Sequence, residues 1–325
     1  MTLSAETKLV KTVFSVALIG LGNVGFGQYL SKRKNQILDH YSAIKSQETL
    51  NLVVCCDKTK PDGIQEPFVS DVSEISSLNV DLLVISTPTE THLNVLETFF
   101  KKNSAKIILV EKPCTNSMHE MNRLTRLLVG HAETEVLVNY HRNYNHVFID
   151  TFGDASLGKL QCGIVHYSNG ALNNASHALA LILPLMGNVS AVKVLGCSQD
   201  KKFQDFDFVL ENFEGSRVVF LATNENFYSN FRLELDYEHG VVSYDSAIGE
   251  ILTRRSIADP DFIDRRNLEP VGHTVITNER LSFQYVYNFL VTKLEKGNVN
   301  PKIGVDMNFA NKIQEIFDEI KKFQL

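Results

Sequence analysis

Three glycines near the start of the sequence have the spacing of a turn that binds phosphate groups. Gly20, Gly22 and Gly25 stand in G-L-G-N-V-G, directly after the apolar run Phe14–Ile19 and before residues with helical spacing. In a strand–turn–helix unit, the first glycine permits a tight turn, the second lets a pyrophosphate approach the backbone, and the third lets helix and strand pack closely. The free N–H groups and the dipole at the helix start favour an anion. The turn therefore predicts a dinucleotide site, although the same pattern also occurs in ordinary loops.

Asp57 is the second candidate, because it directly follows the predicted strand Leu50–Cys56. A carboxylate at this place can accept hydrogen bonds from the ribose 2′-hydroxyl and repels a 2′-phosphate, which favours NAD over NADP. Asp57 lies 32 residues after Gly25, whereas about 20 residues are usual. Lys58 could also assist a 2′-phosphate, so NADP(H) stays open, and a solvated carboxylate in a turn is the alternative.

The elements that must position these residues alternate between strands and helices as far as Asn139. Predicted strands are Phe14–Ile19, Leu50–Cys56, Phe68–Ser70, Val80–Ser86, Lys106–Val110 and Glu135–Asn139. Helical spacing is found at Val24–Lys34, Thr91–Lys102 and Met118–Val129. This alternation predicts a doubly wound parallel sheet, whose ligands lie at the carboxyl ends of the strands. The residues expected at those ends are Gly20–Gly25, Asp57, Ser86–Pro88 and Glu111–Pro113.

Beyond Tyr140, short strands and tight turns predominate. Predicted strands are Lys159–Tyr167, Ala191–Gly196, Phe206–Asn212, Arg217–Ala222, Phe231–Tyr237, Val241–Tyr244 and Glu250–Arg254. Predicted helices are Tyr144–Ser156, His177–Met186, Leu281–Lys296 and Val305–Phe323. A chain of 325 residues favours two domains. We predict a Rossmann domain over residues 1–139, and over 140–325 an α+β domain for substrate binding and oligomerisation, with a large, mainly antiparallel sheet.

Composition narrows the classes of partner. The net charge of −6 and the pI near 5.9 argue against nucleic acid or an anionic membrane as the main partner. No apolar run approaches the ~20 residues of a membrane span, and we interpret the short run after Lys8 and Lys11 as the first strand instead of a signal peptide. The five cysteines form no C-x-x-C pair or ligand spacing, so we expect no metal site and a reducing, cytoplasmic setting.

Five motifs carry a resemblance to a known family. They are G-L-G-N-V-G at 20–25, V-D-L-L-V-I-S-T-P-T-E-T-H at 80–92, V-E-K-P at 110–113, Y-H-R-N-Y at 140–144 and S-N-G-A-L-N-N-A-S-H at 168–177. With them the chain resembles the glucose-fructose oxidoreductase/inositol dehydrogenase/MocA family over most of its first 190 residues. The resemblance implies NAD(P)-dependent redox chemistry on a sugar, polyol or nucleotide-linked sugar. It also implies a homodimer or homotetramer built on the C-terminal sheet.

Lys112 and His177 are the residues that the resemblance makes candidates for the reaction. Hydride transfer to or from a secondary alcohol needs a group that exchanges the hydroxyl proton. The Lys112 cation could polarise a carbonyl oxygen, and Pro113 fixes the backbone after it; a solvated surface lysine is the alternative. His177 could donate or accept the proton, or could be a structural histidine at a helix start. A metal site formed with His166 lacks a third ligand at suitable spacing.

Three positions depart from the family pattern. The carboxylates common four residues before and three residues after the histidine are replaced by Asn173 and Ala180, and the usual glycine two residues before it by Ala175. Asn173 can hydrogen-bond a substrate hydroxyl, but it cannot offset a positive charge as Asp would. Such variants hint at surface-polysaccharide or nucleotide-sugar pathways.

The sequence therefore predicts an NAD(P)-dependent oxidoreductase, with NAD(H) preferred. The alternative is a non-catalytic dinucleotide-dependent sensor or binding protein that kept the fold. Candidate catalytic residues are Lys112, His177 and Asn173. Candidate cofactor-binding residues are Gly20, Gly22, Asn23, Val24, Gly25, Asp57, Ser86, Thr87, Pro88, His92, Glu111 and Lys112. Candidate substrate-binding residues are Tyr140, Arg142, Tyr167, Asn173 and His177, of which Tyr140 and Arg142 could equally be structural; Asn143 could also line the pocket.

Overall fold

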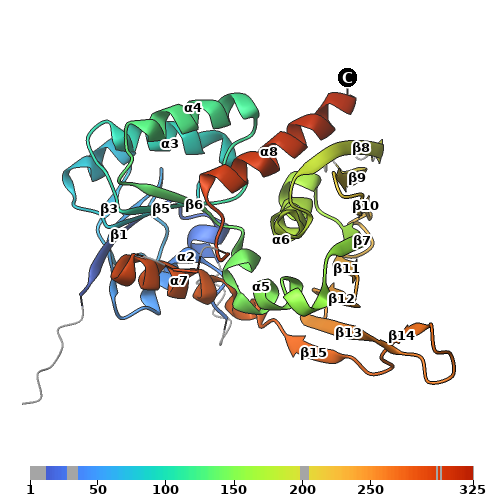
Figure 1. Ribbon diagram of the computed structural model, residues 1–325. Helices are drawn as coiled ribbons and strands as arrows, with labels where there is room; N and C mark the ends of the chain where they lie inside the picture. Colours follow the sequence, from blue (N-terminus) through green and yellow to red (C-terminus); the bar gives the residue numbers. More distant parts are fainter. Residues whose placement is uncertain (1–11, 28–35, 198–204, 298, 301, 325) are drawn as a thin grey trace, which may run out of the picture.

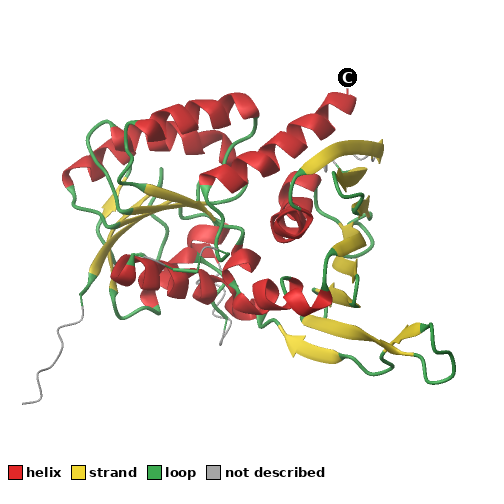
Figure 2. Ribbon diagram, viewed as in Figure 1, coloured by secondary structure: helices red, strands yellow, loops and turns green. Residues whose placement is uncertain are grey.

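The computed structural model describes residues 12–27, 36–197, 205–297, 299–300 and 302–324. Within them, the chain forms two β-sheets that stand side by side, each packed against helices (Figure 1). Helices cover both faces of the first sheet. Those of the second sheet lie on the face that looks toward the first, and no described element covers the other face (Figure 2).

The first sheet consists of six parallel strands in the order β3-β2-β1-β4-β5-β6. They are β1 (Phe14–Ile19), β2 (Leu50–Cys56), β3 (Phe68–Val69), β4 (Leu82–Ile85), β5 (Ile107–Val110) and β6 (Glu135–Val138). β4 and β5 are buried along their whole length, as expected of parallel strands covered on both faces. The predicted doubly wound architecture is confirmed, and β1 and β2 have the predicted bounds.

Two pairs of helices cover the faces of this sheet. α3 (Thr89–Phe100) and α4 (Met118–Val129) lie on one face, and α2 (His40–Lys45) and α7 (Ser282–Lys296) on the other (Figure 1). α7 follows the second sheet in the sequence, yet its buried face, which includes Tyr287, joins the apolar core beneath β1 and β4. The C-terminal part of the chain thus completes the core of the N-terminal sheet.

α2 forms where the sequence pattern indicates only a polar segment. Its N-cap residue Asp39 accepts a hydrogen bond from a backbone N–H of the first turn at 2.6 Å, and His40 is buried. Such a short helix has too few residues to show a periodic apolar pattern. Of the predicted helix Val24–Lys34, residues 28–34 lie outside the described part, and Asn23–Gly27 form a π-helical turn.

The second sheet has nine strands, eight of them in the order β14-β13-β12-β11-β7-β10-β9-β8, with β15 paired to β13. They are β7 (Leu160–Tyr167), β8 (Val189–Cys197), β9 (Phe206–Asn212), β10 (Arg217–Ala222), β11 (Phe231–Tyr237), β12 (Gly240–Asp245), β13 (Glu250–Ala258), β14 (Arg266–Leu268) and β15 (His273–Ile276). Only β7 and β10 pair in parallel, so the mainly antiparallel sheet is confirmed. β14 and β15 were not expected, because they are short and largely exposed and lack apolar alternation.

Three longer helices connect or cover this sheet, and short turns of helix lie between the main elements. The longer ones are α5 (His146–Phe152), α6 (Ser176–Met186) and α8 (Met307–Lys321). The short 3₁₀ helices are Val72–Ser77, η3 (His141–Tyr144), Ala155–Leu157, Glu279–Leu281 and Lys322–Gln324, and Ala171–Ala175 is a second π-helical turn. None of the helices described is long and apolar enough to cross a membrane.

Candidate active site

The glycine turn after β1 is packed so closely that two of its glycines have no room for a side chain. Gly20 has φ +92°, and a Cβ on it would lie 2.6 Å from the backbone carbon of Ser86. A Cβ on Gly25 would lie 2.1 Å from the carbonyl oxygen of Gly20. A Cβ on Gly22 would have no heavy atom within 4 Å. The turn is therefore closely packed at Gly20 and Gly25 and open at Gly22, where a ligand can approach the backbone.

Two predicted cofactor residues hold this turn in place. The Ser86 hydroxyl donates a hydrogen bond to the Gly20 carbonyl at 2.8 Å. One oxygen of the Asp57 carboxylate accepts from the Leu21 N–H at 2.6 Å, and the other accepts from the Lys58 N–H at 2.6 Å. Asp57 is therefore anchored to the turn itself, with lone pairs left for a further donor.

His92 links the loops that follow β4 and β5. Its Nε2 lies 2.8 Å from the Thr87 carbonyl oxygen and its Nδ1 lies 3.1 Å from that of Cys114. Burial lowers the pKa of His92, so its neutral ring donates to one carbonyl at a time. The Pro88 carbonyl oxygen accepts a hydrogen bond from the Thr91 N–H at 2.9 Å. This geometry supports a role in holding the two strand-end loops together.

Glu111 lies in a buried hydrogen-bonded cluster that the sequence does not reveal. Its Oε1 lies 3.0 Å from His40 Nε2 and 2.5 Å from the Asn139 amide nitrogen. His40 Nδ1 in turn lies 2.9 Å from the Tyr287 hydroxyl. Burial alone would raise the pKa of Glu111, but the bonds from His40 and Asn139 and the charge of Lys112 outweigh it and lower the pKa. Glu111 is therefore ionised beside Lys112.

Lys112 links the end of β5 to the π-helical turn before α6. It follows β5, its peptide bond to Pro113 is cis, and its Nζ donates hydrogen bonds to Asn173, at 3.0 Å to the carbonyl oxygen and also to the side-chain oxygen. Burial and the Arg142 charge lower its pKa to about 8, against the opposing charge of Glu111. The fold thus brings together two candidate catalytic residues that are 61 positions apart.

His177, the third candidate catalytic residue, is buried near the start of α6. Its ring centroid lies 5.7 Å from that of Tyr140 and 4.7 Å from that of His141. Its Nδ1 is buried without a hydrogen-bond partner in the described part of the chain. Burial and the positive charges of Lys112 and Arg142 lower the pKa of His177 well below its ordinary value. His177 is therefore a neutral imidazole.

His141 is a neighbour that sequence reasoning missed, although it stands within Y-H-R-N-Y. Burial and the charge of Arg142 lower the pKa of His141 to about 3. It is therefore neutral at physiological pH and places an uncharged ring beside His177.

Arg142 and Tyr167, both predicted to bind substrate, are held by other protein groups. Arg142 Nε and Nη2 lie 2.9 and 3.0 Å from the two carboxylate oxygens of Glu279. Its guanidinium carbon lies 4.2 Å from the ring centroid of Phe231. Tyr167 is fully buried, and its hydroxyl donates to the Phe206 carbonyl at 2.6 Å. These contacts favour structural roles for both residues.

Tyr140 is likewise buried, and burial raises the pKa of its hydroxyl. Its ring lies edge-on to that of His177, so it touches the site through its aromatic edge. The arrangement therefore allows Tyr140 to orient His177.

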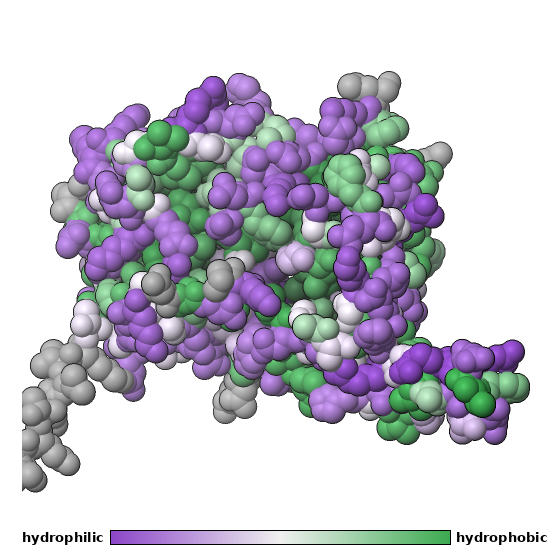
Figure 3. Space-filling model, viewed as in Figure 1, coloured by the Kyte–Doolittle hydropathy of each residue, from purple (hydrophilic) through white to green (hydrophobic). Residues whose placement is uncertain are grey.

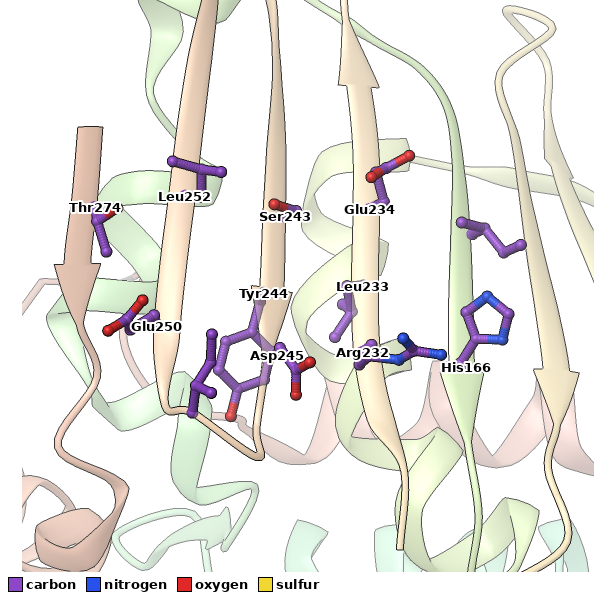
Figure 4. A pocket seen from close by; sticks show the side chains of 12 residues that line it. His166, Arg232, Leu233, Glu234, Ser243, Tyr244, Asp245, Glu250, Leu252 and Thr274 are labelled. Carbon is purple, nitrogen blue, oxygen red and sulfur yellow. The ribbon is translucent and has the colours of Figure 1, made fainter. Parts of the chain in front are cut away.

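His166 does not join His177. It lies on β7 between Val165 and Tyr167, which face the core, so its own side chain points to the uncovered face of the second sheet. There it lines a shallow pocket of about 400 Å³ with Arg232, Glu234 and Ser243 (Figure 4). The described residues contain no group of three or more His, Cys, Asp or Glu side chains that could hold a metal ion.

Solved structures with the same fold cover nearly the whole chain. A candidate NADPH-dependent oxidoreductase from Desulfitobacterium hafniense has a TM-score of 0.74 at 14% identity, over 94% of each chain. UDP-N-acetylglucosamine 3-dehydrogenase from Acidithiobacillus ferrooxidans has a TM-score of 0.71 at 14% identity, over 94% of this chain and 96% of that one. A myo-inositol dehydrogenase from Corynebacterium glutamicum has a TM-score of 0.69 at 15% identity, over 94% and 95%. At such identities the likeness shows the fold alone.

Sequence comparison adds a family match for the N-terminal part of the chain. No curated protein matches the sequence. Residues 14–140 match the profile of the oxidoreductase family with an NAD-binding Rossmann fold, the segment that holds the glycine turn, Asp57, His92 and Lys112. This family profile is that of the glucose-fructose oxidoreductase/inositol dehydrogenase/MocA oxidoreductases, which the chain therefore resembles over its N-terminal part.

Proposed function

We propose that the protein transfers a hydride between a nicotinamide cofactor and a secondary alcohol or ketone of a sugar or nucleotide sugar. The observation that carries the proposal is the meeting of Lys112 and Asn173, with His177 close by, after the carboxyl end of β5. In parallel sheets, ligands lie at that edge. A cation, an amide and a neutral imidazole there suit the exchange of a proton with a hydroxyl oxygen.

The residues present fit a dinucleotide. The open space at Gly22 would admit the pyrophosphate, while Gly20 and Gly25 pack closely against backbone. Asp57 would accept hydrogen bonds from the adenosine ribose, which supports NAD(H) as the preferred cofactor. When bound, the nicotinamide would exchange a hydride with the carbon that carries the reacting oxygen.

Each of the three central residues has a distinct task in this proposal. Lys112 uses two of its three N–H donors on Asn173, which leaves one for the reacting oxygen. His177 is neutral, its Nδ1 has no hydrogen-bond partner among the described residues, and its imidazole would take the hydroxyl proton in the direction of oxidation. Asn173 orients Lys112 without adding a negative charge, so the cation can hydrogen-bond to the reacting oxygen and stabilise the negative charge that develops on it.

Turnover on a panel of substrates tests the proposal. The protein is mixed with NAD⁺ or NADP⁺ and with inositols, free hexoses or UDP-sugars, and absorbance is followed at the reduced-nicotinamide band. We expect reduction of NAD⁺ with at least one member of the panel, and faster with NAD⁺ than with NADP⁺. The UDP-sugars are included because of the Acidithiobacillus dehydrogenase; turnover of them alone would support a place in surface-polysaccharide synthesis. Tight cofactor binding without turnover on any member would instead favour the sensor.

The pH dependence follows from the lowered pKa of Lys112. Reduction of the ketone should slow as pH rises through about 8, because the cation that donates to the oxygen loses its proton there. We expect kcat/KM in the reducing direction to fall about tenfold per pH unit above that point. Lys112→Arg keeps its charge at every accessible pH, so whatever activity it retains should not fall in this range. A wild-type profile that stays level to about pH 10 would contradict the assignment.

We also propose that the chain forms a homo-oligomer through the uncovered face of the second sheet. The arm formed by β13 and β14 projects from the body and carries apolar residues among hydrophilic ones (Figures 1 and 3). Ile263 is fully exposed and Val271 is 81% exposed, and apolar side chains gathered on one projecting arm suit a contact with a second copy. A mass of one chain in sedimentation equilibrium would refute this.

The five cysteines are all free thiols, which suits a protein of the reducing cytoplasm.

A further inference from the structure

The helix that carries His177 contains a proline, and this proline removes one hydrogen bond from it. α6 runs from Ser176 to Met186 and includes Pro184. In a regular α-helix the N–H of residue 184 would donate to the carbonyl of residue 180. Because proline has no N–H, the Ala180 carbonyl loses its helical partner. A carbonyl buried in a core without a donor would cost stability.

Asn143 supplies the missing donor. Its amide nitrogen donates a hydrogen bond to the Ala180 carbonyl oxygen at 2.7 Å, and both groups are buried. The other end of the same amide, Oδ1, is buried without a partner in the described residues. The Asn143 side chain is therefore held chiefly by its bond to α6.

This bond joins two segments that meet at His177. Asn143 lies in η3, and the same segment carries His141 and, at its N-cap, Tyr140. Both of those rings contact the His177 ring. Ala180 lies three residues after His177, so it is a neighbour on the same side of α6. The hydrogen bond thus holds α6 in place at a point about one helical turn beyond the His177 imidazole.

We infer that Asn143 is a positioning residue: it replaces the donor that Pro184 removes from α6 and thereby holds His177 against Tyr140 and His141. That this positioning serves catalysis rests on the function proposed above. The hydrogen-bond exchange itself does not, and it can be tested without cofactor or substrate.

A double-mutant cycle tests the exchange. Asn143→Leu removes the donor at similar volume, and Pro184→Ala restores the N–H to the helix. We expect Asn143→Leu alone to raise the equilibrium constant for urea unfolding about 10- to 100-fold, because a buried carbonyl is left unpaired. In the Pro184→Ala background, the same substitution should raise the unfolding constant by less than about one third of that factor, because the helix then supplies its own donor.

The imidazole of His177 provides a readout that general destabilisation would not move. We expect its titration, followed by NMR of the ring protons and assigned with His177→Ala, to shift upward by about one pH unit in Asn143→Leu as water reaches the ring. Adding Pro184→Ala should return it toward the wild-type midpoint. If Asn143→Leu does not fold, the double variant should, and a double variant that is equally unfolded would overturn the inference.

Asn145 provides the matched control. It is two residues further on, is also buried, and donates its amide to the Thr277 carbonyl at 2.8 Å instead of to α6. Asn145→Leu should destabilise the protein by the same factor with or without Pro184→Ala. Equal effects of Asn143→Leu in the two backgrounds, or a His177 titration that ignores both substitutions, would refute the role of Asn143. A failed turnover assay would leave this result standing and would count only against the proposed function.

Discussion

Replacing Lys112 with Met is expected to lower turnover by about 10³-fold while cofactor binding survives. Methionine keeps most of the apolar stem but lacks the N–H donors. The reacting oxygen then loses its cation, and Asn173 loses the partner that holds it 3.0 Å from Lys112 Nζ. The glycine turn and Asp57 are untouched, so the dissociation constant for NAD⁺ should change by less than about threefold.

Steady-state kinetics and calorimetric titration with NAD⁺ separate these two effects. Lys106→Met is the matched control. Lys106 lies just before β5, at the amino end of the strand and away from Lys112, and it pairs with Asp81 on the surface. It should leave turnover unchanged. A Lys112→Met enzyme with undiminished turnover would remove Lys112 from the reaction.

Replacing Glu279 with Gln is expected to lower the free energy of unfolding by about 3–5 kcal/mol. Arg142 is buried, and Glu279 provides both of its ion-pair contacts, at 2.9 and 3.0 Å. The Tyr244 hydroxyl also donates to the Glu279 carboxylate. Removing the negative charge leaves the guanidinium buried and uncompensated, in the same 3₁₀ helix that carries His141.

The same pair gives a pH dependence of stability. Burial would raise the pKa of Glu279, but the Arg142 charge and hydrogen bonds outweigh it, and the pKa falls below its ordinary 4.5. The stabilisation is therefore complete above pH 4.5 and is lost as pH falls through the lowered value. Glu279→Gln should lack this part of the acid transition. Urea unfolding at pH 7 and at pH 3 measures both.

Glu214→Gln is the control for this second prediction. Glu214 pairs with Lys159 at 2.7 Å, with both side chains more than half exposed, and such pairs contribute little. We expect no measurable change in stability. Equal losses for Glu279→Gln and Glu214→Gln would show that the buried pair has no special weight.

The strands whose bounds were predicted correctly share one physical property. β1, β2, β9, β10 and β11 are apolar or alternating runs that end at turn residues, so local pattern alone determines where they start and stop. The alternation with helices predicts that the strands of the first sheet are parallel. It therefore also predicts that ligands lie at the carboxyl ends of these strands. The positions after β1 and β5 could therefore be assigned to one site without coordinates.

The partners of individual side chains could not be assigned in this way. Arg142 lies within one of the five motifs and Tyr167 lies directly before another. Yet Tyr167 bonds to Phe206 and Arg142 bonds to Glu279. The pairing of His40 with Glu111 joins residues 71 positions apart, and no local signal marks either as a partner of the other.

The sequence by itself determined the parallel sheet and the glycine turn, because these depend on local periodicity and on glycines that backbone contacts require. Only the tertiary structure decided which polar groups face one another: Lys112 with Asn173, His177 with His141, and Asn143 with the Ala180 carbonyl. These pairings depend on how two sheets and the helices between them are docked. Docking is the sum of many weak apolar contacts spread over the whole chain, and no short motif contains it.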